Sequence, residues 1–367
     1  MNESESIEAI QKYHYRKLSG PDDYATLSKA ARDAYQRLTN DEVEFLVLMA
    51  LTDDKKCQNI LACLACLNPG CLKDFHQTLL EQETFQPSEI YFDASQDVTT
   101  TLIRLVNESN EMMQRSSLLT CLAWAGNKVV QKQFSDWRQV PPDWISTLYI
   151  PPHQYAGQAG WELLPDGSRR DLFFETTLPL VTPDQATVNL NAVQTGIPAE
   201  QSCPWCERQL VSLMELDLTS EETSFLNLEG ESLHFTTCDV CACYGTLFSK
   251  VDRQGKSSWH TANLRPGYLP DDTSDWGTFP TKPLVLSGSK RHYMESAESL
   301  HLPAVRFSQI GGLPAWIQDA CYPDCPECSR KMKFIGQISN ADFIKSMEGI
   351  YYLLLCCDCN VTATVYQ

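Results

Sequence analysis

Two stretches decide the fold of this chain: CPWCERQLVSLMELD at residues 203–217 and CPECSRKMKFIGQIS at residues 325–339. Each begins with a Cys-Pro-x-Cys turn and continues as a strand. Further along, LEGESLHFTTCDVC (228–241) and MEGIYYLLLCCDC (347–359) each contain a Glu-Gly turn, a second strand and a second Cys-x-x-Cys pair. Because these features come in the same order in both copies, we predict an internal duplication.

The spacing of these cysteines predicts metal binding. Two residues between cysteines let one tight turn present both thiolates, and two such turns complete a tetrahedron around zinc. Disulfides rarely persist in a reducing compartment, so metal explains the short spacing better than oxidation does. We predict two zinc ions held by Cys203, Cys206, Cys238, Cys241, Cys325, Cys328, Cys356 and Cys359. Four thiolates leave no position for water or substrate, so both ions are expected to be structural.

The other eight of the 16 cysteines are set aside as ligands. Cys243 and Cys357 align with Val361 and Asp239, so neither belongs to the shared pattern. Five lie in or beside helical segments, where a free cysteine behaves as a small buried hydrophobe: Cys57, Cys63, Cys66, Cys71 and Cys121. A third metal site at Cys63 and Cys66 is the alternative reading. Cys321 has no assigned role.

Residues 1–145 carry apolar residues at helical spacing, as in DEVEFLVLMAL (41–51), for which Asn40 or Asp41 is the expected N-cap with Glu44 closing a capping box. NILACLACLNPG (59–70) resembles SLLTCLAWAGNK (117–128) at an offset of 58 residues. This similarity predicts two helix-pair units in a short HEAT-like stack, with a plain helical bundle as the alternative.

The pattern changes after VPPDW (140–144). WELL (161–164) and RRDLFF (169–174) flank a Pro-Asp-Gly-Ser turn, which predicts a hairpin, and helix should be scarce from there on. We therefore predict an α+β multidomain chain. Its parts are a helical domain at 1–145, a β-rich region with the first cysteine copy at 146–302, and the second copy, packed on the first, at 303–367.

Composition and charge narrow the classes of partner. The formal net charge of -18 repels phosphate backbones, and the densest basic cluster is only Arg330, Lys331 and Lys333, so nucleic acid is a disfavoured partner. The N-terminus MNESESIEAI lacks the positive charge and apolar core of a secretory signal. The sequence contains no apolar run of about 18 residues, the length that a membrane-spanning helix needs. We expect a cytoplasmic protein without a membrane partner.

The sequence offers little catalytic equipment. None of the seven histidines belongs to an H-E-x-x-H helix or to a recognisable nucleophile arrangement, and we assign no catalytic residue. His260, next to Trp259, is the strongest candidate for an acid or base. His234 is an alternative ligand near the first cysteine group, although a role outside the metal's own ligands is favoured.

SQIGGLPAWIQDACYPDCPECSRKMKFIGQIS (308–339), followed by EGIYYLLLCCDC (348–359), resembles the YwqG-like family of uncharacterised bacterial proteins. More remotely it is similar to programmed cell death protein 2 and its relatives, a eukaryotic group associated with escorting a newly made ribosomal protein. The resemblance covers residues 305–367, and more weakly 203–250. The resemblance implies that Cys325, Cys328, Cys356 and Cys359 bind metal. It also implies a structural or partner-contact role for Gly311, Gly312, Pro314 and Trp316.

The expected function is that of a non-enzymatic, zinc-stabilised protein-interaction module of the escort-like or immunity type. A strongly acidic chain suits a basic protein partner, because complementary charge speeds encounter and disfavours acidic competitors. Two alternatives remain: an enzyme with a metal-free active site near His260, and a zinc-ribbon protein that binds nucleic acid. Partner identity and oligomeric state are not indicated.

Overall fold

The computed structural model of the protein describes residues 4–15, 21–52, 57–183, 192–272, 279, 283–295, 308–343 and 348–367. The chain divides into two compact units. The first, here called the helical unit, comprises Met1–Asp171 with Ala297–Val305, and the second, here called the β unit, comprises Leu172–Ser296 with Arg306–Gln367. The predicted α+β class, with the helices first, is confirmed.

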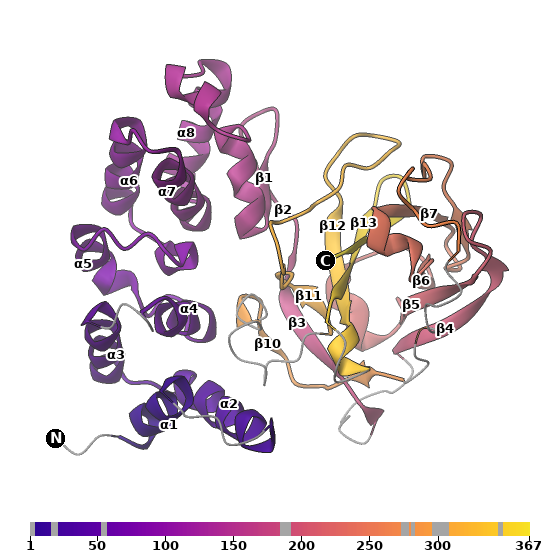
Figure 1. Ribbon diagram of the computed structural model, residues 1–367, viewed down its shortest axis with the longest axis horizontal. Helices are drawn as coiled ribbons and strands as arrows, with labels where there is room; N and C mark the ends of the chain where they lie inside the picture. The colour runs from indigo at the N-terminus through magenta and orange to yellow at the C-terminus, as the bar shows by residue number, and fades with distance from the viewer. Residues whose placement is uncertain are drawn as a thin grey trace. The chain divides into compact units, whose positions relative to one another are not determined.

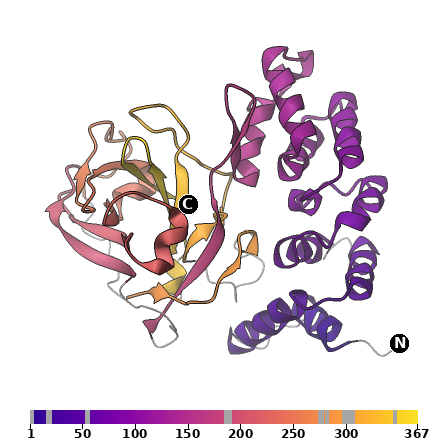
Figure 2. The same cartoon turned by 180° about the vertical axis from the view of Figure 1, so that it is seen from behind.

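The helical unit contains eight α-helices among its described residues: α1 (Glu5–His14), α2 (Pro21–Tyr35), α3 (Asn40–Thr52), α4 (Cys57–Leu67), α5 (His76–Glu81), α6 (Gln96–Glu108), α7 (Met112–Ala125) and α8 (Lys128–Gln139). Short 3-10 helices are η1 (Lys73–Phe75), η2 (Ser88–Tyr91), η3 (Asp143–Thr147) and η4 (Pro152–Ala159). The α-helices follow one another from α1 at one end of the unit to α8 at the other (Figures 1 and 2). Neighbours in sequence pack together, as α3 does with α4 and α6 with α7.

Local chemistry sets the ends of these helices. Asn127 caps α8, since its side-chain oxygen accepts from the backbone N–H groups of Val129 and Val130. The cap of α3 differs from the expected one: Thr39 and Glu42 form the capping box, not Asn40 or Asp41 with Glu44. Threonine followed three residues later by glutamate is the usual form of this motif, so the expected cap was wrong in register.

The predicted hairpin is present as β1 (Trp161–Leu163) paired with β2 (Arg169–Asp171). Its first residue, Trp161, is fully buried in the core of the helices, where its indole N–H donates to the Ala123 carbonyl at 2.8 Å. Its ring stacks on Phe134 with centroids 6.0 Å apart. The helical unit therefore continues beyond residue 145, the predicted end of the helical domain, because the hairpin packs with the helices.

The strands of the β unit form two antiparallel sheets. The larger runs in the order β10-β3-β11-β12-β13-β14-β7-β8, with β9 also paired to β3, and the smaller in the order β4-β5-β6. Their bounds are β3 (Phe174–Val181), β4 (Val193–Ser202), β5 (Gln209–Asp217), β6 (Ser232–Thr237), β7 (Leu247–Val251), β8 (Ser257–Trp259), β9 (Val285–Leu286), β10 (Arg291–His292), β11 (Gln309–Gly312), β12 (Lys333–Ser339), β13 (Ile350–Cys356) and β14 (Val361–Tyr366).

Strand β13 shows why the larger sheet is covered on both faces. Every residue of IYYLLLC is buried, which suits a strand in the middle of a covered sheet rather than one with a wet face. Leu353 and Leu355 enter the core shared with β5 and β6. Tyr352 and Leu354 face the other way, into a second core that contains Tyr322 and has Trp316 at its edge. The smaller sheet therefore lies on one face of the larger, and a loop covers the other.

The described part of the β unit contains 3-10 helices η6 (Glu221–Leu226), η7 (Cys241–Tyr244) and η9 (Asn340–Asp342) but no α-helix. This agrees with the expected scarcity of helix after the hairpin. Within the residues that the structure describes, no helix is long and apolar enough to cross a membrane.

Candidate metal centres

The first Cys-Pro-x-Cys turn has a tightly bonded backbone. The Cys203 N–H donates to the Arg208 carbonyl at 2.7 Å, and the Glu207 N–H donates to the Cys203 carbonyl at 2.9 Å. Glu207 takes a left-handed conformation with φ of 61°. That conformation is uncommon for a residue with a side chain, so the turn holds it against a cost of about 1 kcal/mol. The result is a loop that presents both thiols on one side.

The second Cys-Pro-x-Cys turn repeats this pattern. The Cys325 N–H donates to the Arg330 carbonyl at 2.8 Å, and the Ser329 N–H donates to the Cys325 carbonyl at 2.8 Å. Ser329, which corresponds to Glu207 of the first turn, has φ of 59°. Both turns therefore reach the same geometry with different residues after the second cysteine.

The first predicted ligand set comes together as Cys203, Cys206, Cys238 and Cys241, whose sulfurs all lie within 4.8 Å of one another. The sulfur of Cys206 is 3.5 Å from those of Cys238 and Cys241, and the Cys203 and Cys241 sulfurs are 3.7 Å apart. Four sulfurs at about 2.3 Å from a central zinc would be about 3.8 Å apart in a regular tetrahedron. A disulfide would need about 2.05 Å. The spacing fits a metal ion and no disulfide.

The second set comes together in the same way, as Cys325, Cys328, Cys356 and Cys359. The sulfurs of Cys328 and Cys356 are 3.6 Å apart, and all four lie within 4.8 Å of one another. In both groups the third cysteine lies at or next to the end of a strand: Cys238 directly follows β6, and Cys356 is the last residue of β13. Each group of four could therefore hold a metal ion.

Backbone donors prepare the first group for negative charge. The Trp205 N–H donates to the Cys203 sulfur, and the Cys241 N–H to the Cys238 sulfur, both at 3.4 Å. Hydrogen bonding with Cys238 and Cys241 lowers the pKa of the Cys203 thiol, and the same hydrogen bonding raises the pKa of both partners. Without a metal, one thiolate is thus stabilised by its neighbours. Four thiolates together require a cation.

In the second group the Arg330 backbone N–H is the largest influence on Cys328, and it lowers the pKa of that thiol to about 7. Burial raises the pKa of Cys359 to about 11. The donors of this group also differ from one another in acidity, so metal binding has to displace protons.

Strands β7 and β8 contact both Cys-Pro-x-Cys turns. Lys250 on β7 donates to the Glu327 carboxylate at 2.8 Å and to the Cys359 carbonyl at 2.6 Å. Trp259 on β8 packs edge-on against Trp205, with ring centroids 5.2 Å apart. Sequence reasoning missed Lys250 because it lies 77 residues from Glu327 and belongs to no motif. Only the pairing of β7 with β14 brings it to the second site.

His260 lies beside this contact, not among the sulfurs. Its Nε2 is 3.5 Å from a carboxylate oxygen of Glu327, and its Nδ1 accepts from the Ala262 N–H at 3.0 Å. His234, the alternative ligand, has its Nδ1 3.6 Å from the carboxylate of Glu215 on the neighbouring strand. Both histidines are thus placed next to glutamates.

The basic cluster beside the second site lies next to acidic and aromatic groups. Arg330 pairs with Asp358 at 2.6 Å, and Lys331 with Asp324 at 3.1 Å. The Lys333 ammonium lies 3.8 Å from the centre of the Phe174 ring. Two of the three positive charges in this cluster are therefore paired with carboxylates, which weakens the cluster as a contact surface for phosphates.

The Gly-Gly-Leu-Pro-Ala-Trp loop begins in β11, where Gly311 and Gly312 have φ of 67° and 72°. A Cβ on Gly311 would collide with the Thr176 carbonyl oxygen of the neighbouring strand, so only glycine fits there. The loop then buries Pro314 and places the half-buried Trp316 ring 4.2 Å from that of Tyr352, centroid to centroid. Those contacts close the second core, and contact with a partner stays a prediction.

The Tyr352 hydroxyl ties the same loop to the sheet. It donates to the Ala315 carbonyl at 2.6 Å and accepts from the Ile317 N–H at 3.1 Å. The Ala315 N–H in turn donates to the Gln337 side chain at 2.9 Å. The polar backbone of the loop is thus paired as it crosses apolar residues.

The helical cysteines are buried as small apolar groups, as expected. Cys63, Cys66 and Cys121 are completely buried, and the half-buried Cys71 thiol donates to the Leu64 carbonyl at 3.5 Å. The side chain of Cys57 lies outside the described residues. Within the described part of the chain, no group of three or more metal-binding side chains includes these cysteines.

A helical unit joined to an antiparallel β unit with two four-cysteine groups defines the class of this protein: a two-unit chain with two candidate metal centres. The chain is 36% identical to the uncharacterised protein YpfL of Salmonella typhimurium strain LT2 over 346 residues, which cover 91% of this chain and 79% of YpfL. The chain belongs to the same family as YpfL. No family model and no solved structure matches it. An uncharacterised bacterial family is thus established, whereas the YwqG-like and cell death protein 2-like names stay predictions.

Proposed function

We propose that this protein is a non-enzymatic, cytoplasmic protein-interaction module whose β unit is stabilised by two structural zinc ions. The observation that carries the proposal is the pair of four-sulfur groups with separations of 3.5 to 3.7 Å, close to those of a tetrahedral site. Four sulfurs would saturate the ion and leave no position for a substrate, so the metal acts on folding rather than on chemistry.

Zinc is the proposed metal because the donors are all thiols. Thiolates select zinc, copper(I) and iron over the hard cations magnesium and calcium, and tetrahedral sulfur sites are those of zinc and iron. Zinc needs no redox partner and is the usual ion of closed four-cysteine sites built from paired turns at strand ends. Elemental analysis of the purified protein separates zinc from iron directly.

The order of strands supports the proposed duplication. The first cysteine group follows the order β4-β5-β6, and the second the order β11-β12-β13, with all pairings antiparallel. The next strand of each half, β7 and β14, pairs with its counterpart. We infer that the two halves are copies of one ancestral unit that meet along this strand pair.

The proposed HEAT-like stack is supported by the two segments that resemble each other. They lie in α4 and α7, and three of their four matched pairs are completely buried in both: Leu61, Cys63 and Leu64 in the first, Leu119, Cys121 and Leu122 in the second. Both helices contact η2, which lies between them in sequence. A repeated helix that is apolar all round fits a stack in which neighbours cover both of its sides.

A basic protein is the proposed partner class, and an escort-like or immunity-type role is the proposed setting. The net charge of -18 would attract such a partner and speed its association. No specific observation favours the two alternatives. Glu327 and a backbone N–H engage both nitrogens of His260. Two of the cations near the second site are paired with Asp358 and Asp324.

Affinity capture with the tagged, full-length protein tests this function. The extract is bound at about 50 mM and eluted at about 500 mM salt, because complementary charge is screened at the higher concentration. We expect specific recovery of a basic protein that leaves with salt. Recovery no different from that of an acidic control protein of similar charge would reject the proposal.

A further inference from the structure

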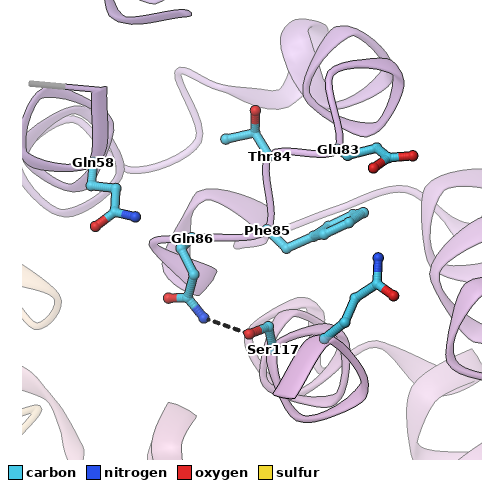
Figure 3. A pocket seen from close by; sticks show the side chains of 7 residues that line it. Gln58, Glu83, Thr84, Phe85, Gln86 and Ser117 are labelled. Atoms are coloured by element: carbon cyan, nitrogen blue, oxygen red, sulfur yellow. Dashed lines mark hydrogen bonds between the residues drawn. The ribbon is translucent and has the colours of Figure 1, made fainter. Parts of the chain in front are cut away.

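Two adjoining hollows in the helical unit form one groove, lined by both polar and apolar side chains. Their volumes are about 430 and 340 Å³, and they share Glu83, Phe85 and Gln114 in their lining. Figure 3 shows the first hollow, where the segment from Glu83 to Gln86 crosses between the helices that carry Gln58 and Ser117. The shared residues mean that an elongated ligand could occupy both hollows at once.

Several side-chain amides lie in the lining. Four glutamines contribute to the groove: Gln58, Gln77, Gln86 and Gln114. The Gln86 amide nitrogen donates to the Ser117 hydroxyl at 3.0 Å (Figure 3). The Gln114 carbonyl oxygen accepts from the Ser109 hydroxyl at 2.9 Å. Among the described residues, the Gln86 side-chain oxygen and the Gln114 amide N–H groups have no partner. The groove therefore offers both an acceptor and donors at fixed positions.

The middle of the groove is held rigidly. Phe85 is 8% exposed, and its backbone carbonyl accepts from the buried Cys121 thiol at 3.3 Å. The neighbouring Thr84 carbonyl accepts from the Tyr91 hydroxyl at 3.0 Å. Because these bonds fix the backbone from below, the polar groups above are positioned before any ligand arrives.

The charge of the groove is negative. Three carboxylates line it, those of Glu81, Glu83 and Glu108, against one guanidinium, that of Arg104. Arg104 is paired with Glu108, and Glu81 accepts from Gln77 at 3.0 Å. Glu83 is exposed, and its carboxylate has no hydrogen bond or ion pair with any described residue. It is therefore available to a cation from outside.

We infer that this groove binds an extended, basic segment of the partner protein. An extended segment exposes unpaired N–H and C=O groups, which side-chain amides can satisfy, whereas a helix has already paired its own. A lysine or arginine of the segment pairs with Glu83. The inference rests on the proposed function, since it names the surface and the chemistry by which that function recognises its partner.

Three labelled nine-residue peptides test the groove on the full-length protein by fluorescence anisotropy at about 50 mM salt. One alternates lysine with threonine, a residue that favours extended backbone. The second replaces lysine with glutamate, and the third carries N-methyl groups in place of the backbone N–H groups of the first. We expect the first to bind, the second not to bind, and the third to bind at least threefold more weakly, because it cannot donate to the glutamine oxygens.

Glu83→Gln removes the charge and keeps the shape of the side chain. It should weaken the lysine peptide about threefold and reduce the salt dependence of its binding, as expected for one exposed ion pair. Glu44→Gln is the matched control, since Glu44 is an exposed glutamate on α3 outside the groove, and should leave binding unchanged. Thermal unfolding checks that both variants stay folded.

Equal losses in the two variants, or equal binding of the first and third peptides, would overturn the groove and leave only general attraction to an acidic protein. The outcome is separable from that of the proposed function. A partner captured equally well by Glu83→Gln and the unchanged protein would reject the groove alone. Selective peptide binding without any captured partner would reject the proposed function alone.

Discussion

Thr39 and Glu42 cap α3 by exchanging hydrogen bonds: the Thr39 N–H donates to the Glu42 carboxylate at 2.7 Å, and the Glu42 N–H donates to the Thr39 hydroxyl at 3.4 Å. Thr39→Ala should destabilise the helical unit by about 1 kcal/mol, measured by circular dichroism during urea unfolding. Thr52→Ala, at the other end of α3, removes a hydroxyl whose one hydrogen bond to a described residue goes to the Met49 carbonyl, and should cost less.

The same cap depends on pH. Hydrogen bonds from Ser4 and Thr39 lower the pKa of Glu42, so the folded state favours the ionised carboxylate. A lowered folded-state pKa gives stability that is present above the unfolded value and is lost as pH falls. The difference in the free energy of unfolding between the protein and its Thr39→Ala variant should therefore become smaller below about pH 4. A difference that grows on acidification would contradict this assignment.

Gly311 tests the tight approach of β11 to β3. Gly311→Ala forces a Cβ toward the Thr176 carbonyl at a φ of 67° and should destabilise the β unit by about 2 kcal/mol or more. Gly245→Ala, in the same unit, meets no atom within 4 Å and has an extended φ, so it serves as the control. Differential scanning calorimetry compares the two. Equal melting temperatures would show that the strand pair can move apart at little cost.

At the scale of elements, Lys250 makes β7 part of the second candidate metal site, since it bonds to Glu327 and to the Cys359 carbonyl. Lys250→Met keeps the aliphatic stem and removes the charge. We expect about tenfold weaker metal binding at this site, as is typical when a group that orients a ligand is lost. Competition with a coloured chelator measures it. Lys256→Met, an exposed lysine beyond the same strand, should not change metal affinity.

The strands also show which parts of the fold could be predicted from the sequence. The run IYYLLLC (350–356) and the Cys-x-x-Cys pairs marked β13 and the two ligand sets, because apolar runs and ligand spacing are local signals. The pairing of β7 with β14 joins residues more than 100 positions apart and leaves no local pattern. The sequence also did not predict that Trp161 packs in the core of the helices, because its hydrogen-bond partner Ala123 lies 38 residues away.

At the scale of the whole molecule, the two units have separate cores, and all eight candidate ligands lie in the β unit. Removing metal should therefore loosen that unit selectively. In hydrogen exchange after treatment with a strong chelator, we expect faster exchange in β5, β6, β12 and β13, and unchanged exchange in α4 and α7. Uniform acceleration in both units would mean that the helices depend on the metal as well.

The metal content of the purified protein tests the central claim most directly. Elemental analysis of protein prepared without chelators should give about two zinc ions per chain, one for each group of four cysteines. Cys206→Ser and Cys328→Ser should each lower the content by about one ion, whereas Cys243→Ser should leave it unchanged. A content near zero in the folded protein, or iron in place of zinc, would contradict the account.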